Sequence, residues 1–264
     1  MIEALDGSRD VNELRPVICV AGMHRSGTSM VARLLSLCGV YLGPPENLSR
    51  SGPDNQGGFW ENPDFVELND NLLAVVHAGW DLLPSEFEWA PRPELAASLA
   101  KATQLIERSA VHQPWGWKDP RNSLTLPFWQ RLIPNLKVII CLRNPFEVAR
   151  SLTVRNGTSL AFGLNLWRSY NLAVCSFAAK QDRLVTHYEA YFSDPRGELR
   201  RVLDFLSIPA SDKEIDQACL TATSDLRHHK VPPELLAARA SPQIIGLYSE
   251  LCAEAGPLFQ ASLK

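Results

Sequence analysis

The fold of this chain is decided by the stretch Val17-Ile18-Cys19-Val20-Ala21-Gly22-Met23-His24-Arg25-Ser26-Gly27-Thr28-Ser29. Its first five residues are all apolar, which predicts a strand buried on both faces of a parallel sheet. The remaining residues have the frame Gly-x-x-x-x-Gly followed by two hydroxyl side chains, and a helical pattern begins at Thr28. This spacing is typical of a loop that binds a phosphate through backbone N–H groups and a helix N-terminus.

The loop departs from that of nucleoside triphosphatases at one position. Thr28 stands where those proteins have a lysine that reaches the β- and γ-phosphates. The sequence therefore favours a nucleotide with a short 5′ end.

The overall composition is that of a globular protein. Of 264 residues, 45% are hydrophobic and 21% are charged, and the formal net charge is −3. This charge argues against general nucleic-acid binding, for which a basic surface is expected. We expect a flexible tail over residues 1–15 and a single domain over residues 16–264.

No apolar run approaches the ~18 residues that a membrane-spanning helix requires. The polar segment Met1–Arg15 also lacks the apolar core of a signal peptide. We therefore expect a cytoplasmic protein without an integral membrane segment.

The chain has six cysteines, and none is part of a C-x-x-C pair or of a cysteine–histidine pattern with zinc spacing. Most of them lie in apolar stretches, which indicates reduced cysteines in the core. We therefore expect no metal site. The cysteines are Cys19, Cys38, Cys141, Cys175, Cys219 and Cys252.

Strand and helix patterns alternate along the chain, which predicts an α/β fold, a three-layer sandwich with a central parallel sheet. The expected strands are Val17–Ala21, Trp115–Lys118, Lys137–Leu142 and Arg183–His187. The expected helices are Thr28–Cys38, Asp64–His77, Glu94–Val111, Pro145–Val154, Leu160–Lys180 and Pro195–Leu206. A long loop, Gly43–Pro63, interrupts the pattern and is expected to be functional or mobile.

Two further polar clusters follow predicted strands, where ligands of parallel α/β sheets bind. One is Lys118-Asp119-Pro120-Arg121. The other consists of Arg143, Ser151 and Arg155, the last two one helical turn apart. Two guanidinium groups and a hydroxyl suit a second phosphate, although a solvated helix face is the alternative.

The three clusters, in this order, resemble the sulfotransferases that use 3′-phosphoadenosine-5′-phosphosulfate (PAPS), with features of the bacterial, tyrosylprotein and carbohydrate branches. The resemblance extends from about Val17 to Leu206. It implies that Arg25, Ser26, Gly27, Thr28 and Ser29 bind the 5′-phosphosulfate of PAPS.

The same resemblance assigns roles to the other clusters. Arg143 and Ser151 match the pair that binds the 3′-phosphate. Arg155 and Tyr188 match residues near the nucleotide in the tyrosylprotein branch, and Lys118 matches its catalytic lysine. Ser224 and Arg227 are weaker candidates for a late loop that covers the nucleotide.

The implied reaction is direct in-line transfer of a sulfuryl group to a hydroxyl of a glycan, lipid or small metabolite. Arg25 and Lys118 are expected to stabilise charge in the transition state, without a metal. The expected base is Glu61, in a Gly-Phe-Trp-Glu context similar to a bacterial branch, and the alternative is Glu46, placed as in the tyrosylprotein branch. His24 is a third candidate.

Two other functions stay open at this point. One is a P-loop nucleotide kinase or NTPase, which would need a magnesium-binding acid where Arg143 stands. The other is a catalytically inactive nucleotide-binding relative. The sequence does not indicate the acceptor or the oligomeric state.

Overall fold

The computed structural model describes residues 15–49, 52, 57–84, 89, 92–222, 236 and 238–256. Apart from Arg15, the tail expected over residues 1–15 lies outside the described residues, as do Ser224 and Arg227.

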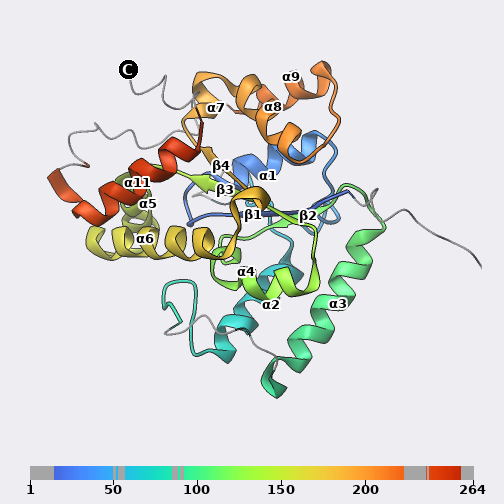
Figure 1. Ribbon diagram of the computed structural model, residues 1–264, viewed down its shortest axis with the longest axis horizontal. Coiled ribbons are helices and arrows are strands. Elements are labelled where there is room, and N and C mark those ends of the chain that lie inside the picture. The colour runs from blue at the N-terminus through green and yellow to red at the C-terminus, as the bar shows by residue number, and fades with distance from the viewer. Residues whose placement is uncertain are drawn as a thin grey trace, which may run out of the picture.

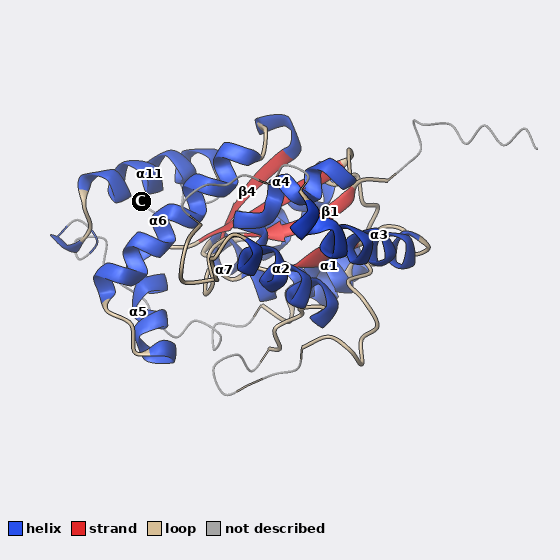
Figure 2. Cartoon of the chain, turned by 90° about the horizontal axis from the view of Figure 1, so that it is seen from below, coloured by secondary structure: helices blue, strands red, loops and turns tan. Residues whose placement is uncertain are grey.

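Four parallel strands form the centre of the molecule, in the order β2-β1-β3-β4. They are β1 (Val17–Ala21), β2 (Gly116–Lys118), β3 (Leu136–Leu142) and β4 (Arg183–His187). Since all strands run in one direction, their carboxyl ends meet at one edge of the sheet (Figures 1 and 2). The predicted strands and parallel sheet are confirmed.

The strands are buried because helices cover both faces of the sheet. Ile18 and Val20 of β1 contribute to the core on one face, and Val17, Cys19 and Ala21 contribute to the core on the other. This alternation follows from the two-residue period of a strand. The predicted three-layer sandwich is therefore confirmed.

One face is covered by four helices, seen above the sheet in Figure 1. They are α1 (Thr28–Leu37), α7 (Ala190–Ser193), α8 (Pro195–Phe205) and α9 (Asp212–Cys219). The other face is covered by α2 (Pro63–Val75), α3 (Ala96–Ala110), α4 (Asn122–Leu132), α5 (Pro145–Asn156), α6 (Leu160–Phe177) and α11 (Pro242–Glu254). Short 3-10 helices, η2 (Pro93–Leu95) and η3 (Lys180–Asp182), precede α3 and β4.

The helix α4 was not predicted, because Pro127 stands inside it and proline usually ends a helix. Here burial compensates, since Leu124, Phe128 and Trp129 are all in the core. The last element predicted from the sequence ends at Leu206, so the helices α9 and α11, which follow it, were not predicted.

All six cysteines are among the described residues and none forms a disulfide. Four are buried and two, Cys175 and Cys219, are partly buried. In the described part of the chain, no helix is both long and apolar enough to span a bilayer.

Candidate active site

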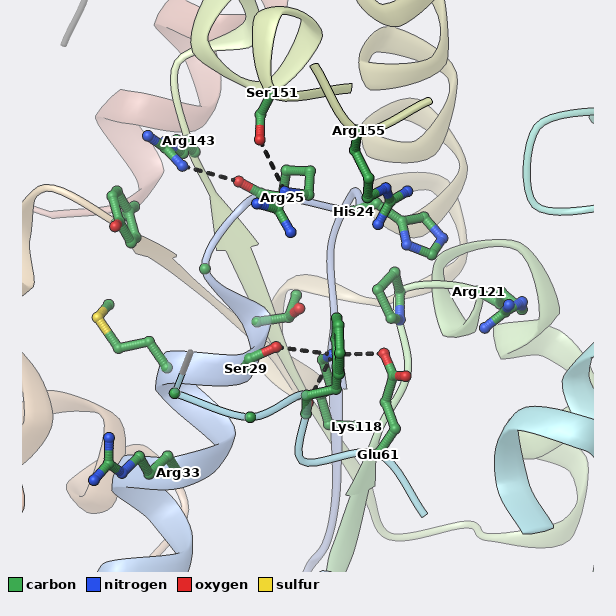
Figure 3. A pocket seen from close by; sticks show the side chains of 18 of the residues that line it. His24, Arg25, Ser29, Arg33, Glu61, Lys118, Arg121, Arg143, Ser151 and Arg155 are labelled. Atoms are coloured by element: carbon green, nitrogen blue, oxygen red, sulfur yellow. Dashed lines mark hydrogen bonds and ion pairs between the residues drawn. The ribbon is translucent and has the colours of Figure 1, made fainter. Parts of the chain in front are cut away.

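A cavity of about 900 Å³ opens at the carboxyl ends of the strands. Its walls come from the loop after β1, the start of α1, the segment 57–61, the end of β2, and α5 (Figure 3). This is the place where ligands of parallel α/β sheets bind. It brings together all three clusters found in the sequence.

The loop between β1 and α1 is shaped by its glycines. Gly27 has φ +87°, and a Cβ at this position would lie 2.5 Å from Cδ2 of Tyr188. Gly22 has φ +126°, and its Cβ would lie 2.5 Å from the carbonyl oxygen of Cys141. Only glycine fits either place, so the loop can approach the ring of Tyr188 and the end of β3.

The start of α1 faces the cavity. The side chain of Ser26 is buried, and its Oγ makes no hydrogen bond with a described residue. Thr28 and Ser29 also line the cavity, in the first turn of α1. The positive end of a helix dipole therefore points at this place, which suits an anion.

Arg25 connects the loop to α5. Its Nε donates a hydrogen bond to Oγ of Ser151 at 2.8 Å. Its carbonyl oxygen accepts a hydrogen bond from Nη1 of Arg143 at 3.2 Å. The loop and the predicted second anion site therefore lie side by side (Figure 3).

Arg143, the first residue after β3, is enclosed by protein groups. Its Nε forms an ion pair with Oε2 of Glu147 at 2.9 Å. Its guanidinium carbon lies 4.3 Å from the centre of the Tyr188 ring. Arg143 is thus held in place by side chains from α5 and from the end of β4.

Lys118, at the end of β2, is only 2% exposed, and its ammonium group contacts three oxygen atoms of the protein. Nζ lies 2.7 Å from Oε1 of Glu61 and donates to Oγ of Ser29 at 3.2 Å. It also donates to the carbonyl oxygen of Phe59 at 3.1 Å. Lys118 therefore connects the first turn of α1 with the segment that carries Glu61 (Figure 3).

The residues after Lys118 form a buried polar network. Oδ1 of Asp119 accepts from Nη1 of Arg121 at 3.1 Å, and Oδ2 accepts from Nδ2 of Asn69 at 2.9 Å. Arg121 also pairs with Asp70 on α2. Burial raises the pKa of the Asp119 carboxyl, while the charge of Arg121 opposes that shift. The network fixes the turn that carries Lys118.

His24 lines the cavity from within the loop. Its ring makes edge contacts with Trp80 and Tyr170, at centroid distances of 5.1 and 6.0 Å. Burial lowers the pKa of His24 well below 6.5, and the nearby cations, Arg121 first, lower it further. The imidazole is therefore neutral at physiological pH.

The described residues contain no group of three or more histidine, cysteine or carboxylate side chains arranged to hold a metal ion.

Comparison with known proteins identifies the family. The sequence profile of the sulfotransferase family matches residues 16–212. The chain belongs to the sulfotransferase family. This confirms the resemblance found in the sequence and the enzyme class it implied.

Curated relatives include tyrosylprotein sulfotransferases of nematodes. The chain is 28% identical to protein-tyrosine sulfotransferase A of Caenorhabditis elegans over 106 residues, which is 36% of this chain and 28% of that protein. It is 25% identical to a putative protein-tyrosine sulfotransferase of Caenorhabditis briggsae over 214 residues, 77% of this chain and 69% of that protein.

Solved structures of other sulfotransferases share the fold. Sulfotransferase STF1 of Mycobacterium tuberculosis H37Rv aligns with a TM-score of 0.56 and 15% identity, covering 88% of this chain and 77% of that one. The sulfotransferase domain of the Synechococcus PCC 7002 olefin synthase aligns with a TM-score of 0.55 and 21% identity, covering 92% and 96%. At these identities the likeness establishes the fold alone.

Almost all site residues expected from the sequence of this sulfotransferase line the one cavity described above. They are Arg25, Gly27, Thr28, Ser29, Glu61, Lys118, Arg143, Ser151, Arg155 and Tyr188. Ser26, in the same loop, is buried and is not among the lining residues. The guanidinium carbon of Arg155 lies 5.4 Å from the centre of the Trp80 ring, next to His24.

Glu46 is an expected site residue that does not line the cavity. Its side chain is exposed in the turn that follows Pro44, and it is not among the lining residues. Glu61, by contrast, lines the cavity and contacts Lys118. Of the two glutamates considered for this sulfotransferase, the geometry therefore favours Glu61.

Sequence reasoning missed two residues that shape the site. Asn69 supports Asp119, and Glu147 pairs with Arg143. Only Glu147 had a signal in the sequence, since it stands four residues after Arg143 with opposite charge.

Proposed function

We propose that this sulfotransferase moves the sulfuryl group of PAPS to a hydroxyl of a glycan, lipid or small metabolite. The observation that carries the proposal is the pair of hydrogen bonds made by Arg25. They connect the phosphate-type loop to Ser151 and Arg143 within one cavity. PAPS has two separated anionic ends on one adenosine, and this arrangement supplies cationic and hydroxyl groups for both.

In this proposal the loop residues Arg25–Ser29 bind the 5′-phosphosulfate through backbone N–H groups and the N-terminus of α1. Arg143 and Ser151 bind the 3′-phosphate, and the ring of Tyr188 packs beside the nucleotide. Arg155, which lines the same cavity, adds positive charge. A loop with Thr28 in place of lysine suits this donor better than a nucleoside triphosphate.

Glu61 is the proposed general base. Its Oε1 is bound to Lys118, which leaves Oε2 to take the proton of the acceptor hydroxyl. The same contact holds Lys118 next to Ser29, at the start of α1. In this proposal, Lys118 and Arg25 stabilise negative charge on the sulfonate and on the departing phosphate oxygen.

We expect sulfuryl transfer to need no metal ion in addition to these residues. PAPS carries a good leaving group, so positioning and charge stabilisation supply most of the catalysis, as in phosphoryl transfer. We expect transfer to proceed in the presence of EDTA.

Nucleotide binding tests the proposal directly. Adenosine 3′,5′-bisphosphate (PAP) at 100 times its dissociation constant should add about 2.7 kcal/mol to the free energy of unfolding. For a chain of this size, that raises the melting temperature by about 5–10 °C. ADP should stabilise less. Stronger stabilisation by ATP with Mg²⁺, or magnesium-dependent ATP turnover, would reject the proposal in favour of a kinase or NTPase.

Catalysis is tested by Lys118→Met, which keeps the bulk of the side chain and removes its charge. We expect conversion of PAPS to PAP in the presence of a mixed set of hydroxyl acceptors to fall by at least about 100-fold. PAP binding should change only slightly. Binding of PAP by a wild-type protein without any transfer would support the inactive relative instead.

A further inference from the structure

Glu147 is a buried acid beside a proposed phosphate site. It occupies the first turn of α5, where Asn144 caps the helix and accepts hydrogen bonds from the backbone N–H groups of Phe146 and Glu147. The residue is 4% exposed, and its Oε2 lies 2.9 Å from Nε of Arg143. The carboxylate is thus fixed by the helix and paired with Arg143.

The position of this carboxylate is electrostatically unfavourable for an anionic ligand. A negative charge paired with Arg143 reduces the positive potential that a phosphate would meet there. Its burial also carries a desolvation cost. A residue that weakens anion binding and costs stability needs another effect to offset both, and orientation of Arg143 is the effect that the geometry offers.

Three contacts restrain the guanidinium of Arg143. Glu147 holds Nε, the carbonyl oxygen of Arg25 holds Nη1, and the ring of Tyr188 covers one face. Because these contacts are made within the protein, they cost side-chain entropy on folding and not on binding. Without Glu147, the guanidinium would lose this carboxylate contact and could rotate more freely about its last bonds.

We propose that Glu147 is a positioning residue that holds Arg143 in the orientation required to bind the 3′-phosphate of the donor. The inference rests on the proposed function, because it assigns the 3′-phosphate to Arg143. It adds that orientation by Glu147 outweighs the electrostatic repulsion that its charge causes.

The test compares two nucleotides that differ only in the 3′-phosphate, PAP and AMP. PAP affinity is measured by isothermal titration calorimetry and AMP affinity by displacement of PAP. Glu147→Ala removes the contact, and we expect it to weaken PAP binding about tenfold, as the loss of a charge-assisted hydrogen bond predicts. AMP binding should change less than about twofold, since AMP makes no contact with Arg143.

Glu147→Gln is the rescue variant, because the amide oxygen of Gln can still accept from Nε of Arg143. We expect PAP affinity to equal or exceed that of the wild type, since orientation is kept and the opposing charge is gone. If Glu147→Ala does not fold, Glu147→Met fills the same space without an acceptor atom and gives the same readout.

Glu198 provides a matched structural control. Like Glu147 it is a buried glutamate paired with an arginine, but this arginine, Arg201, does not line the cavity, whereas Arg143 does. Glu198→Ala should lower the melting temperature and leave the ratio of PAP to AMP affinity unchanged.

Two outcomes would overturn the inference. One is PAP binding by Glu147→Ala or Glu147→Met that is as tight as in the wild type or tighter. The other is an equal loss of PAP and AMP affinity, which would make Glu147 a purely structural residue. Failure of the proposed function looks different, because the wild type itself would then bind PAP no better than ATP with Mg²⁺.

Discussion

Nε of Arg25 donates a hydrogen bond to Oγ of Ser151 at 2.8 Å, although the two residues are 126 positions apart in the sequence. Arg25 belongs to the loop after β1, and Ser151 belongs to α5 after β3. These strands are neighbours in the sheet, so the segments that follow them meet at its carboxyl edge. The two predicted anion sites are therefore parts of one site.

Replacing Ser151 should remove a contact that joins the two predicted anion sites. Ser151→Ala removes the partner of Arg25 and one hydroxyl for the 3′-phosphate, so we expect PAP affinity to fall about tenfold. Calorimetry measures the change. Ser176→Ala on α6 is the control, since its hydroxyl donates to the nearby Ala173 carbonyl oxygen and the residue does not line the cavity. PAP binding by Ser151→Ala at wild-type strength would contradict the arrangement.

The two loop glutamates give a second prediction. Glu61→Gln keeps an oxygen for Lys118 but cannot take a proton, so we expect kcat to fall by about 10²–10⁴-fold with little change in PAP affinity. Glu46→Gln should leave kcat unchanged, because Glu46 is exposed away from the cavity. The rate of PAP release from PAPS measures both. A large loss in Glu46→Gln alone would reverse the assignment.

Two glycines with similar backbone conformations separate backbone strain from contact with Tyr188. Gly39 has φ +90° with nothing within 4 Å of its Cβ position, whereas Gly27 has φ +87° with the Tyr188 ring 2.5 Å away. Gly39→Ala should lower the free energy of unfolding by about 1 kcal/mol. Gly27→Ala should lower it further and also weaken PAP binding, because the loop or the ring must move. Denaturant titration and calorimetry measure the two effects, and equal losses would argue against the contact.

Buried neutral histidines predict loss of stability in mild acid. Burial lowers the pKa of His187 to about 3, and that of His24 well below 6.5, while both titrate near 6.5 when unfolded. Between these values the unfolded chain binds protons that the native state does not. Stability therefore falls as pH drops below 6.5, by about 1 kcal/mol per histidine between pH 7 and 5.5.

Guanidinium chloride titrations at pH 7 and 5.5 measure this loss. His187→Asn should reduce it by about 1 kcal/mol, because asparagine has no titrating ring. Its side-chain oxygen can still accept from the backbone N–H of Glu189, as Nδ1 of His187 does. An unchanged pH dependence in His187→Asn would show that the native state binds this proton as readily as the unfolded chain.

Much of the fold could be predicted because its signals are local. The strands Val17–Ala21 and Leu136–Leu142 are nearly continuous apolar runs, and the loop between β1 and α1 has fixed glycine spacing. The helix α4 could not be predicted in this way, because local propensity at Pro127 opposes it. Only its packing against the core explains why it forms.

Some residues of the candidate site could likewise be predicted from the sequence, and others could not. Residues that follow strands, such as Lys118 and Arg143, could be assigned to one edge of the sheet from the order of elements alone. The positions of Glu61 beside Lys118 and of Glu46 away from the cavity could not be predicted. Both residues lie in an irregular loop, where no repeating pattern of apolar residues indicates the path of the chain. The contact of Trp80 with His24 is likewise a product of tertiary packing.

The hydrogen bond between Arg143 and the carbonyl oxygen of Arg25 has a consequence for inhibitor chemistry. It holds the guanidinium of Arg143 against the main chain of the loop that carries Arg25. We therefore expect a rigid scaffold with two acidic groups, spaced to reach both the loop and Arg143, to bind more tightly than a mono-acid that reaches only one of them. We expect the separation of the two acidic groups to make such a compound selective for this protein over ATP-dependent enzymes.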